Sequence, residues 1–326
     1  MFEHSLPTND YSSKARSPLV TVQMPVYNGQ EYLAETIESI LNQTFRDFEF
    51  LMLDDGSTDE SLNLLRSYAE KDSRIHVITR ENRGLGETQR ELAESANGEF
   101  IAQMDQDDVS MLNRLELQVD FLRKNPNVAV VGGAYQMIDG AGRYLTTLKQ
   151  PISNTEIQAL ILGGHCAIAH SGAMMRSADI KSIGGYDKNF NTATDLDLWL
   201  RLGEVGELAN LSDVVFKYRL HDKSASEKVG QSQRNEARKA CENAWKRRNI
   251  TYEFSADQLW RPGPDKESRH KFMLKYGWWA WNSNEFMTAF FYGWQAIKAK
   301  PLSLAGWKLL AVSLISKVNN REKRCH

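Results

Sequence analysis

Short apolar runs alternate with stretches of helical spacing between residues 19 and 131, and this order restricts the possible folds more than any other feature of the chain. We interpret the apolar runs as buried strands, at residues 19–24, 48–53, 75–79, 100–104 and 128–131. The stretches between them carry apolar residues about every 3.6 positions, which predicts helices at 31–41, 59–69, 85–96 and 112–122. Such alternation predicts an α/β fold in which helices cover both faces of a mainly parallel sheet. Ligands of such sheets bind beyond the carboxyl ends of the strands.

The second half of the chain follows a different pattern. Beyond residue 133 the apolar segments become irregular, with one further strand predicted at 214–219. A polar, basic helix is predicted at 231–248, and an aromatic-rich helical stretch follows it. We therefore predict three parts, which are a flexible tail at 1–17, an α/β domain at 18–225 and a basic, aromatic-rich helical region at 226–326.

The net charge of −2 conceals two oppositely charged parts. Residues 1–227 contain 21 Lys and Arg against 34 Asp and Glu, whereas residues 228–326 contain 19 against 8. An imbalance of this kind predicts an acidic part that binds a ligand or metal, joined to a basic segment that meets an anionic surface.

Three kinds of protein are disfavoured by the sequence. The first 17 residues hold no apolar core of a signal peptide, and no uncharged apolar run of about 18 residues occurs that would span a bilayer. The cysteines Cys166, Cys241 and Cys325 lie far apart and form no paired motif, which argues against a disulfide framework or a zinc site. We therefore expect a cytoplasmic protein with reduced thiols.

Two adjacent carboxylates, Asp54 and Asp55, follow the predicted strand at 48–53 and precede a helix. In a parallel sheet this is the place where ligands bind, and the start of the helix offers unpaired N–H groups. The same residues also fit a simple turn in which Ser57 or Thr58 caps the helix and Asp59 interacts with its dipole. Both interpretations can hold together.

A second acidic segment, Asp105-Gln106-Asp107-Asp108, follows the predicted strand at 100–104. Carboxylates two residues apart on an extended segment point the same way, and they suit Mg²⁺ or Mn²⁺. An ion held by so few protein ligands takes the others from water and substrate phosphates. Plain exposure to solvent is the alternative. An EF-hand loop is excluded, because Val109 and Ser110 stand where that loop needs an oxygen ligand and a glycine.

Asp195 and Asp197 begin a predicted helix whose buried face carries Leu198, Trp199 and Leu202. A carboxylate in the first turn is stabilised by the helix dipole, and it can act as a general base if it faces a cleft. The simpler alternative is that Asp195 only caps the helix.

Basic residues near these acids are further candidates. The chain has His170 and Arg176 in one segment, and Arg219 and His221 in another. A loop histidine is more often structural than catalytic. Arg219 and His221 can balance the charge of a diphosphate if they lie at the acidic cleft.

Taken together, these segments resemble the family 2 glycosyltransferases of the GT-A fold, over residues 18–225. The resemblance rests on six motifs in the family's order and approximate spacing. They are residues 22–28 with Glu31, 53–59, 82–85, 104–110 with 114–116, 184–187, and 195–202 followed by 218–221.

The resemblance implies a GT-A catalytic domain and a role for each matching residue. Asp105 and Asp107 match the family's DxD motif, in which Asp107 binds the divalent metal, Mg²⁺ or Mn²⁺, that bridges the donor diphosphate. Asp195 matches the general base, and His221 is a further candidate metal ligand. Asp55 would accept a hydrogen bond from the base of the nucleotide. The residues implied for binding the nucleotide sugar are Pro25, Tyr27, Asn28, Glu31, Asp54, Asp55, Gly84, Asp105 and Gln106.

The activity implied is inverting, metal-dependent transfer of a sugar from a UDP-sugar or dTDP-sugar to a glycan or lipid-linked acceptor, in cell-surface polysaccharide synthesis. A nucleotidyltransferase is a second possibility, but it needs a Gly-rich, basic loop after the first strand, where this chain has Pro25-Val26-Tyr27-Asn28-Gly29. The third is a nucleotide- or glycan-binding protein of the same fold that has lost catalysis.

Seven of the eight tryptophans lie after residue 240, among scattered lysines and arginines, in a stretch that Pro301 interrupts. This composition suits a helix that lies on the anionic inner face of the cytoplasmic membrane. The same aromatics would equally pack against the catalytic domain, or against a second subunit in a homodimer. A nucleic-acid partner is disfavoured, because the basic residues are spread out and no known binding module is present.

Overall fold

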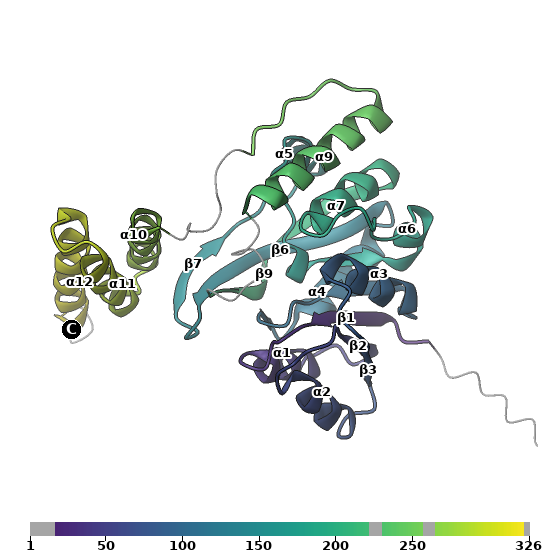
Figure 1. The fold of residues 1–326 in the computed structure, drawn as a ribbon, viewed down its shortest axis with the longest axis horizontal. Coiled ribbons are helices and arrows are strands. Elements are labelled where there is room, and N and C mark those ends of the chain that lie inside the picture. Colours follow the sequence, from purple (N-terminus) through teal and green to yellow (C-terminus); the bar gives the residue numbers. More distant parts are fainter. Residues whose placement is uncertain (1–16, 222–229, 257–264, 323–326) are drawn as a thin grey trace, which may run out of the picture.

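The computed structural model describes residues 17–221, 230–256 and 265–322, so the predicted tail lies outside the described residues except at its last position. The first half of the chain alternates strands and helices as the sequence predicts (Figure 1). Its elements are β1 Val20–Val26, α1 Leu33–Leu41, β2 Phe48–Asp54, α2 Ser61–Ala69, β3 Ile75–Thr79, α3 Leu85–Ser95, β4 Phe100–Gln103, β5 Val109–Ser110 and α4 Arg114–Lys124.

The strands of this half form a parallel unit in the order β3-β2-β1-β4. Successive residues of a strand point to opposite faces of the sheet. On β2, Met52 therefore packs among side chains of α1, α2 and α4, whereas Leu51 and Leu53 pack against Leu92 of α3. Helices cover both faces of the sheet, as predicted.

The long strand β6, Val128–Asp139, continues well past the predicted end at residue 131. It pairs in parallel with β9, Glu207–Leu220, which contains the predicted strand at 214–219. Gly132 and Gly133, which look like a chain break in the sequence, lie inside β6. A Cβ on Gly132 would stand 2.3 Å from Asn210 Oδ1, and one on Gly133 would stand 2.7 Å from the Val215 side chain. These glycines therefore allow β9 to approach closely.

Shorter elements between β6 and β9 complete a mixed, nine-stranded sheet. They are β7 Tyr144–Leu148, α5 Asn154–Leu162, the single turn η1 His170–Gly172, β8 Met174–Arg176, α6 Ser177–Ser182 and α7 Thr194–Val205. The sheet continues from β4 in the order β8-β6-β9-β5, and β8 is antiparallel to both of its neighbours.

In the part of the chain that the structure describes, four helices follow β9, namely α9 Gly230–Arg248, α10 Lys266–Asn282, α11 Phe286–Ala299 and α12 Leu304–Glu322. Helix α9 packs along α7 and α5, whereas α10 to α12 form a bundle beyond β7 (Figure 1). The predicted interruption at Pro301 is the connection between α11 and α12. Among the helices that the structure describes, none has the length and apolarity needed to cross a bilayer.

The C-terminal bundle packs on the end of the sheet through a shared apolar cluster. Ala280, Ala289 and Leu309 of the bundle are buried with Met137 of β6 and Leu145 of β7. Polar contacts add to this packing, since the Tyr292 hydroxyl donates to Asp139 Oδ2 at 3.0 Å. Many of the C-terminal aromatics are therefore accounted for by packing within the chain, which is one of the alternatives left open above.

Candidate functional site

The loops that follow β1 and β4 are fastened together by one side chain. The Tyr27 N–H donates to Gln106 Oε1 at 2.9 Å, and Gln106 Nε2 donates back to the Tyr27 carbonyl at 3.1 Å. Gly29 leaves room for this amide, because a Cβ there would lie 2.4 Å from Gln106 Oε1. Gln106 thus ties the loop after β1 to the acidic segment 105–108 at the carboxyl edge of the sheet.

The loop after β1 is also tied to the loop after β2. Asn28, which has a positive φ of 49°, donates its N–H to Ser57 Oγ at 3.0 Å and accepts from the Thr58 N–H at 2.8 Å. Ser57 and Thr58 are therefore engaged with Asn28, and the alternative in which either caps α2 is wrong. Instead, the Asp59 carboxylate accepts from the Ser61 N–H at 3.0 Å at the start of that helix.

Asp54 and Asp55 are buried, with 1% and 4% exposure, and their carboxylates accept hydrogen bonds from the loops at this edge. Asp54 accepts from the Ser57 N–H at 3.2 Å and the Thr79 hydroxyl at 2.9 Å. Asp55 accepts from two backbone N–H groups, those of Arg83 at 2.8 Å and Gly84 at 2.9 Å, and it pairs with Arg80. Gly84 needs its positive φ of 89° to present its N–H there.

The other residues implied for nucleotide binding differ in exposure. Pro25 is buried within β1, Tyr27 is 47% exposed directly after that strand, and Glu31 is exposed just before α1. The Tyr27 ring is therefore exposed at the ends of β1 and β2, on loops that hydrogen bonds hold together.

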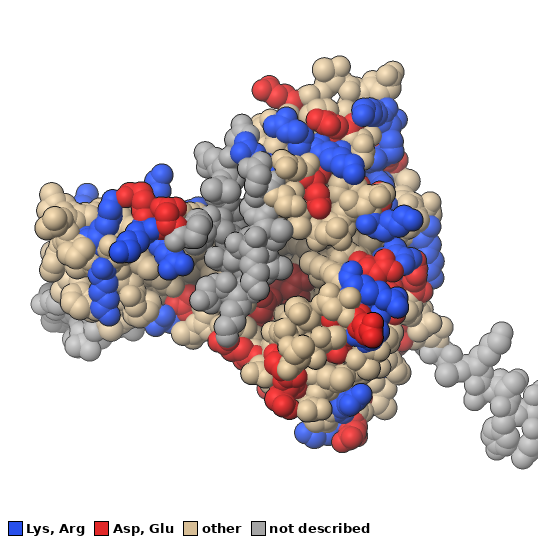
Figure 2. Space-filling view, viewed as in Figure 1, with Lys and Arg blue, Asp and Glu red and all other residues tan. Residues whose placement is uncertain are grey.

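Asp105 and Asp107 lie with two histidines at the end of β4. His221 Nε2 is 2.7 Å from Asp107 Oδ2, and His170 Nδ1 is 3.9 Å from Asp105 Oδ1. Burial raises the pKa of Asp105, the His170 charge opposes that rise, and the charges of Asp107 and Asp195 add to it. The Asp105 side chain is nevertheless 35% exposed. A group that solvent reaches and that protein also surrounds lies at the floor of a cleft, and Figure 2 shows acidic side chains deep in a hollow on this face.

Strand β9 supports this acidic segment through Arg219. The Arg219 N–H donates to Asp108 Oδ1 at 2.8 Å, and its Nε donates to the Asp107 carbonyl at 2.8 Å. Its guanidinium pairs with Glu35 at 2.6 Å and is almost fully buried. Arg219 therefore holds the loop that carries Asp107 and Asp108, and the Glu35 carboxylate already balances the charge of its guanidinium. Arg176 lies elsewhere, where it donates to the carbonyls of Val128 and Leu122.

The two aspartates of α7 have different surroundings. Asp197 is 2% exposed and pairs with Arg201, whose guanidinium also donates to the Gly185 carbonyl at 2.6 Å. Asp195 is partly exposed, and its Oδ1 accepts from the Leu196 N–H at 2.8 Å. The helix cap is Ala193, so the alternative in which Asp195 caps α7 is wrong. Asp197 is held in a buried ion pair, whereas Asp195 is partly exposed and near enough to Asp105 for its charge to add to the rise that burial causes in the pKa of Asp105.

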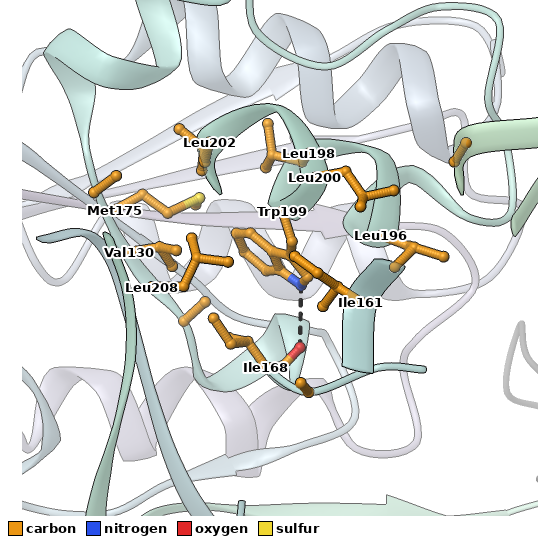
Figure 3. Close-up of a cluster of buried hydrophobic side chains, with 14 of the residues drawn as sticks. Val130, Ile161, Ile168, Met175, Leu196, Leu198, Trp199, Leu200, Leu202 and Leu208 are labelled. Carbon is orange, nitrogen blue, oxygen red and sulfur yellow. Dashed lines mark hydrogen bonds between the residues drawn. The ribbon is translucent and has the colours of Figure 1, made fainter. Parts of the chain in front are cut away.

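Trp199 fixes α7 to the rest of the domain. It is fully buried in the apolar cluster of Figure 3, and its Nε1–H donates to the Ile168 carbonyl at 3.1 Å. This bond holds the segment from Cys166 to His170 against α7. The Cys166 Sγ consequently lies 3.8 Å from Asp195 Oδ2.

Two residues of this cleft were not predicted from the sequence. Cys166 lies beside Asp195, and Tyr186 has its hydroxyl 2.9 Å from His170 Nε2. Burial, followed by the charges of Asp105 and Asp195, raises the pKa of Tyr186. Cys166 belongs to no motif, and Tyr186 stands within the motif at 184–187 but was assigned no role there.

Within the described residues, no three His, Cys, Asp or Glu side chains are grouped closely enough to form a metal cage. The acidic segment instead forms two separate contacts between a carboxylate and an imidazole, Asp107 with His221 and Asp105 with His170.

Comparison with known proteins gives one family. The model of the family described as "Glycosyl transferase family 2" matches residues 21–184. Chondroitin synthase from Escherichia coli is 30% identical over 212 residues, which are 65% of this chain and 30% of that protein's length. The putative glycosyltransferase EpsE of Bacillus subtilis is 35% identical over 211 residues, which cover 62% of this chain and 73% of its own length.

Solved structures share the fold at low sequence identity. S. aureus TarS 1-349 in complex with UDP-GlcNAc has a TM-score of 0.58 and 16% identity, with 92% of this chain and 88% of that chain covered. The mannosyltransferase PcManGT from Pyrobaculum calidifontis, in complex with GDP-Man and Mn²⁺, has a TM-score of 0.53 and 17% identity, with 92% and 81% covered. The expected GT-A architecture, with its C-terminal helices, is confirmed by these likenesses.

Proposed function

Because the chain belongs to glycosyltransferase family 2, we propose that it transfers a sugar with inversion from a UDP-sugar or dTDP-sugar to a glycan or lipid-linked acceptor. The observation that carries the proposal is the meeting of Asp105, Asp107, His221 and Asp195 in one cleft at the carboxyl edge of the sheet. We further propose a role in cell-surface polysaccharide synthesis, since one relative is a chondroitin synthase.

The nucleoside end of the donor would lie over the loops after β1 and β2. There the exposed Tyr27 ring provides an apolar surface, and the buried Asp55 carboxylate directly follows β2. The hydrogen bonds from Gln106 and Asn28 hold these loops before any ligand arrives, which lowers the ordering cost of binding. The proposed nucleotide-binding residues remain Pro25, Tyr27, Asn28, Glu31, Asp54, Asp55, Gly84, Asp105 and Gln106.

The acidic segment fits a divalent cation. Asp105 and Asp107 supply hard oxygen ligands, and the imidazole of His221 already lies against Asp107. When Mg²⁺ or Mn²⁺ is bound, it neutralises the charge that develops on the leaving diphosphate. Burial is the main cause of the raised pKa of Asp105, and the charge of Asp107 adds to it, so a cation beside these carboxylates is electrostatically favoured.

Asp195 would act as the general base. Its carboxylate takes the proton of the acceptor hydroxyl while the hydroxyl oxygen bonds to the anomeric carbon, and the bond from that carbon to the diphosphate oxygen breaks. A single in-line displacement inverts the configuration. Trp199 anchors the helix that carries Asp195, which keeps the base in place.

The test is release of nucleoside diphosphate from a panel of UDP-, dTDP- and GDP-sugars with Mn²⁺. We expect Asp107→Ala and Asp195→Ala each to lower turnover by at least about 100-fold. Asp120→Ala, an exposed acid on α4, is the matched control and should be unchanged. Wild-type turnover in both site variants would overturn the assigned roles. Tight UDP binding with no turnover on any donor would favour a binding protein.

We also propose that the tip of the C-terminal region contacts the anionic inner face of the cytoplasmic membrane. Leu302 and Leu304 are 99% and 82% exposed, and Trp307, whose Nε1–H donates to the Pro301 carbonyl, is 48% exposed beside them. Isolated leucines at a surface are ordinary, but an exposed Leu–Leu–Trp tip with nearby lysines suits the interface of a bilayer.

Sedimentation with vesicles of phosphatidylglycerol and phosphatidylcholine tests this contact. Leu302→Glu with Leu304→Glu should abolish binding, and Ile152→Glu, at a residue 57% exposed on the catalytic domain, should leave it intact. Equal binding of both variants would contradict the proposal. A concentration-dependent mass that the tip variant loses would show a homodimer contact instead.

A further inference from the structure

The start of α7 is capped by a side chain from another helix. Ala193, at the N-cap position, makes no capping bond of its own. Oε2 of Glu236, on α9, accepts instead from the N–H groups of Asn191 at 2.9 Å, Thr192 at 2.7 Å and Ala193 at 3.2 Å. It also accepts from the Thr192 hydroxyl at 2.9 Å. One carboxylate therefore gathers three consecutive backbone N–H groups.

This cap is an electrostatically strong one. A carboxylate at a helix N-terminus interacts with the partial positive charge of the unpaired N–H groups. Burial works against the charge of Glu236, but the hydrogen bonds from Thr192 and Asn191 outweigh it and hold its pKa below the ordinary value. The carboxyl group of Glu236 is therefore ionised at neutral pH.

Asp195 depends on this turn for its direction. It lies two residues after Ala193, in the first turn of α7, and its own carboxylate accepts from the next N–H in the chain, that of Leu196. Ala193 and Thr194 are buried, with 2% and 6% exposure, and the buried face of α7 continues with Leu196 and Leu198, so the core holds one side of this turn. On the side of α9, Glu236 binds the N–H groups of residues 191–193, and Gln233 Nε2 donates to the Thr192 carbonyl at 3.3 Å.

Helix α9 is attached to α7 at its other end as well. Arg247 pairs with Glu204 at 2.8 Å, and Arg248 donates to the Leu200 carbonyl at 2.7 Å. The far-end contacts hold the two helices together without touching the first turn. They therefore provide a natural control for the effect of the cap.

We infer that Glu236 is a positioning residue for Asp195, so that helix α9, beyond the predicted end of the catalytic domain at residue 225, is required for full transfer activity. This inference rests on the proposed role of Asp195 as the general base. It assigns the start of the C-terminal region a part in catalysis that is separate from any contact of the bundle with a membrane.

Hydrogen–deuterium exchange tests the cap without donor or acceptor. In Glu236→Ala the amides of residues 191–193 should exchange at least about tenfold faster, because each loses its acceptor. In the control Glu204→Gln, which weakens only the far end, these amides should exchange as in the wild type. Unchanged exchange in Glu236→Ala would overturn the inference, even if no donor is ever turned over.

Kinetics then separate positioning from general stability. With the donor that the wild type hydrolyses fastest, Glu236→Ala should lower kcat by about 10- to 100-fold with little change in the KM for the donor. Glu236→Gln, which keeps an acceptor oxygen, should recover part of the loss, and Glu204→Gln should be unaffected.

A double-mutant cycle gives the decisive comparison. If Glu236 acts through Asp195, its removal in an Asp195→Ala background should cost no further activity. An equal loss in both backgrounds would mean that Glu236 serves only the fold, and the inference would fail. If every variant, including Asp195→Ala, kept its activity, the proposed function would be contradicted instead. The exchange measurement would then still decide whether Glu236 caps α7.

Discussion

The two aspartates of α7 should separate activity from stability. Asp197 is 2% exposed, and Arg201 donates to it at 2.5 and 2.8 Å. Removing one partner of a buried ion pair costs about 3–5 kcal/mol. Burial raises the pKa of Asp197 although Arg201 opposes this, so desolvation offsets part of the gain. After the loss of Asp197, Arg201 also keeps its hydrogen bond to the Gly185 carbonyl. For Asp197→Ala we therefore expect the free energy of unfolding to fall by about 3 kcal/mol, the lower end of that range. This loss lowers Tm by roughly 6–12 °C in a chain of this size.

Asp195→Ala should behave in the opposite way. Its carboxylate is partly exposed and accepts only from the Leu196 N–H and, weakly, from the Cys166 thiol, so its loss costs at most about 1 kcal/mol. Turnover should nevertheless fall by about 100-fold or more, since the general base is gone. Circular dichroism melting and release of nucleoside diphosphate measure the two quantities on the same preparations. If Asp197→Ala abolished turnover at an unchanged Tm while Asp195→Ala remained active, the assignment of the base would be refuted.

Three further results are expected. A maleimide on Cys166 should block transfer but not UDP binding, and Cys166→Ala should be active and resistant; a fully labelled, fully active enzyme would contradict this. Burial, and after it the Asp195 charge, raises the pKa of that thiol, so labelling should be slower than that of a free cysteine thiol at the same pH. Gln106→Ala, which loses both bonds to the Tyr27 backbone, should weaken UDP binding about tenfold by calorimetry, and unchanged affinity would refute the role of that clamp. Because the folded-state pKa of Glu236 is depressed, its stabilisation is present above about pH 4.3 and lost as the pH falls. The Tm difference between wild type and Glu236→Gln should therefore shrink in acid, and a constant difference would be inconsistent with the cap.

The parallel half of the fold could be predicted because its signals are local. Apolar runs and helical spacing up to residue 131 correspond to β1 to β4 and α1 to α4, within a few residues at each end. The strand order in the rest of the sheet, from β8 to β5, could not, since its determinants are distant in sequence. Gly132 and Gly133 resemble a break until Asn210 and Val215 are seen against them, and β8 is a three-residue strand whose partners lie in β4 and β6.

The acidic side chains of the cleft were predicted because charge clusters after strands stand out in a sequence. His170 and His221 were also candidates, but Cys166 and Glu236 were not, because a single side chain far away in the sequence carries no pattern. The pairing of His221 with Asp107, the thiol beside Asp195 and the Glu236 cap each join residues 29 to 114 positions apart. The choice between Asp195 and Asp197 likewise depended on burial, which the spacing of two aspartates does not reveal.

The most direct test of the proposed site is a crystal structure with UDP and Mn²⁺, in which anomalous scattering locates the manganese. We expect a manganese peak at coordination distance from Asp107, with the diphosphate on the ion, the uracil at the loops after β1 and β2, and Asp195 facing the open side of the cleft. Manganese and nucleotide bound elsewhere, with the Asp107 carboxylate left in its contact with His221, would contradict it.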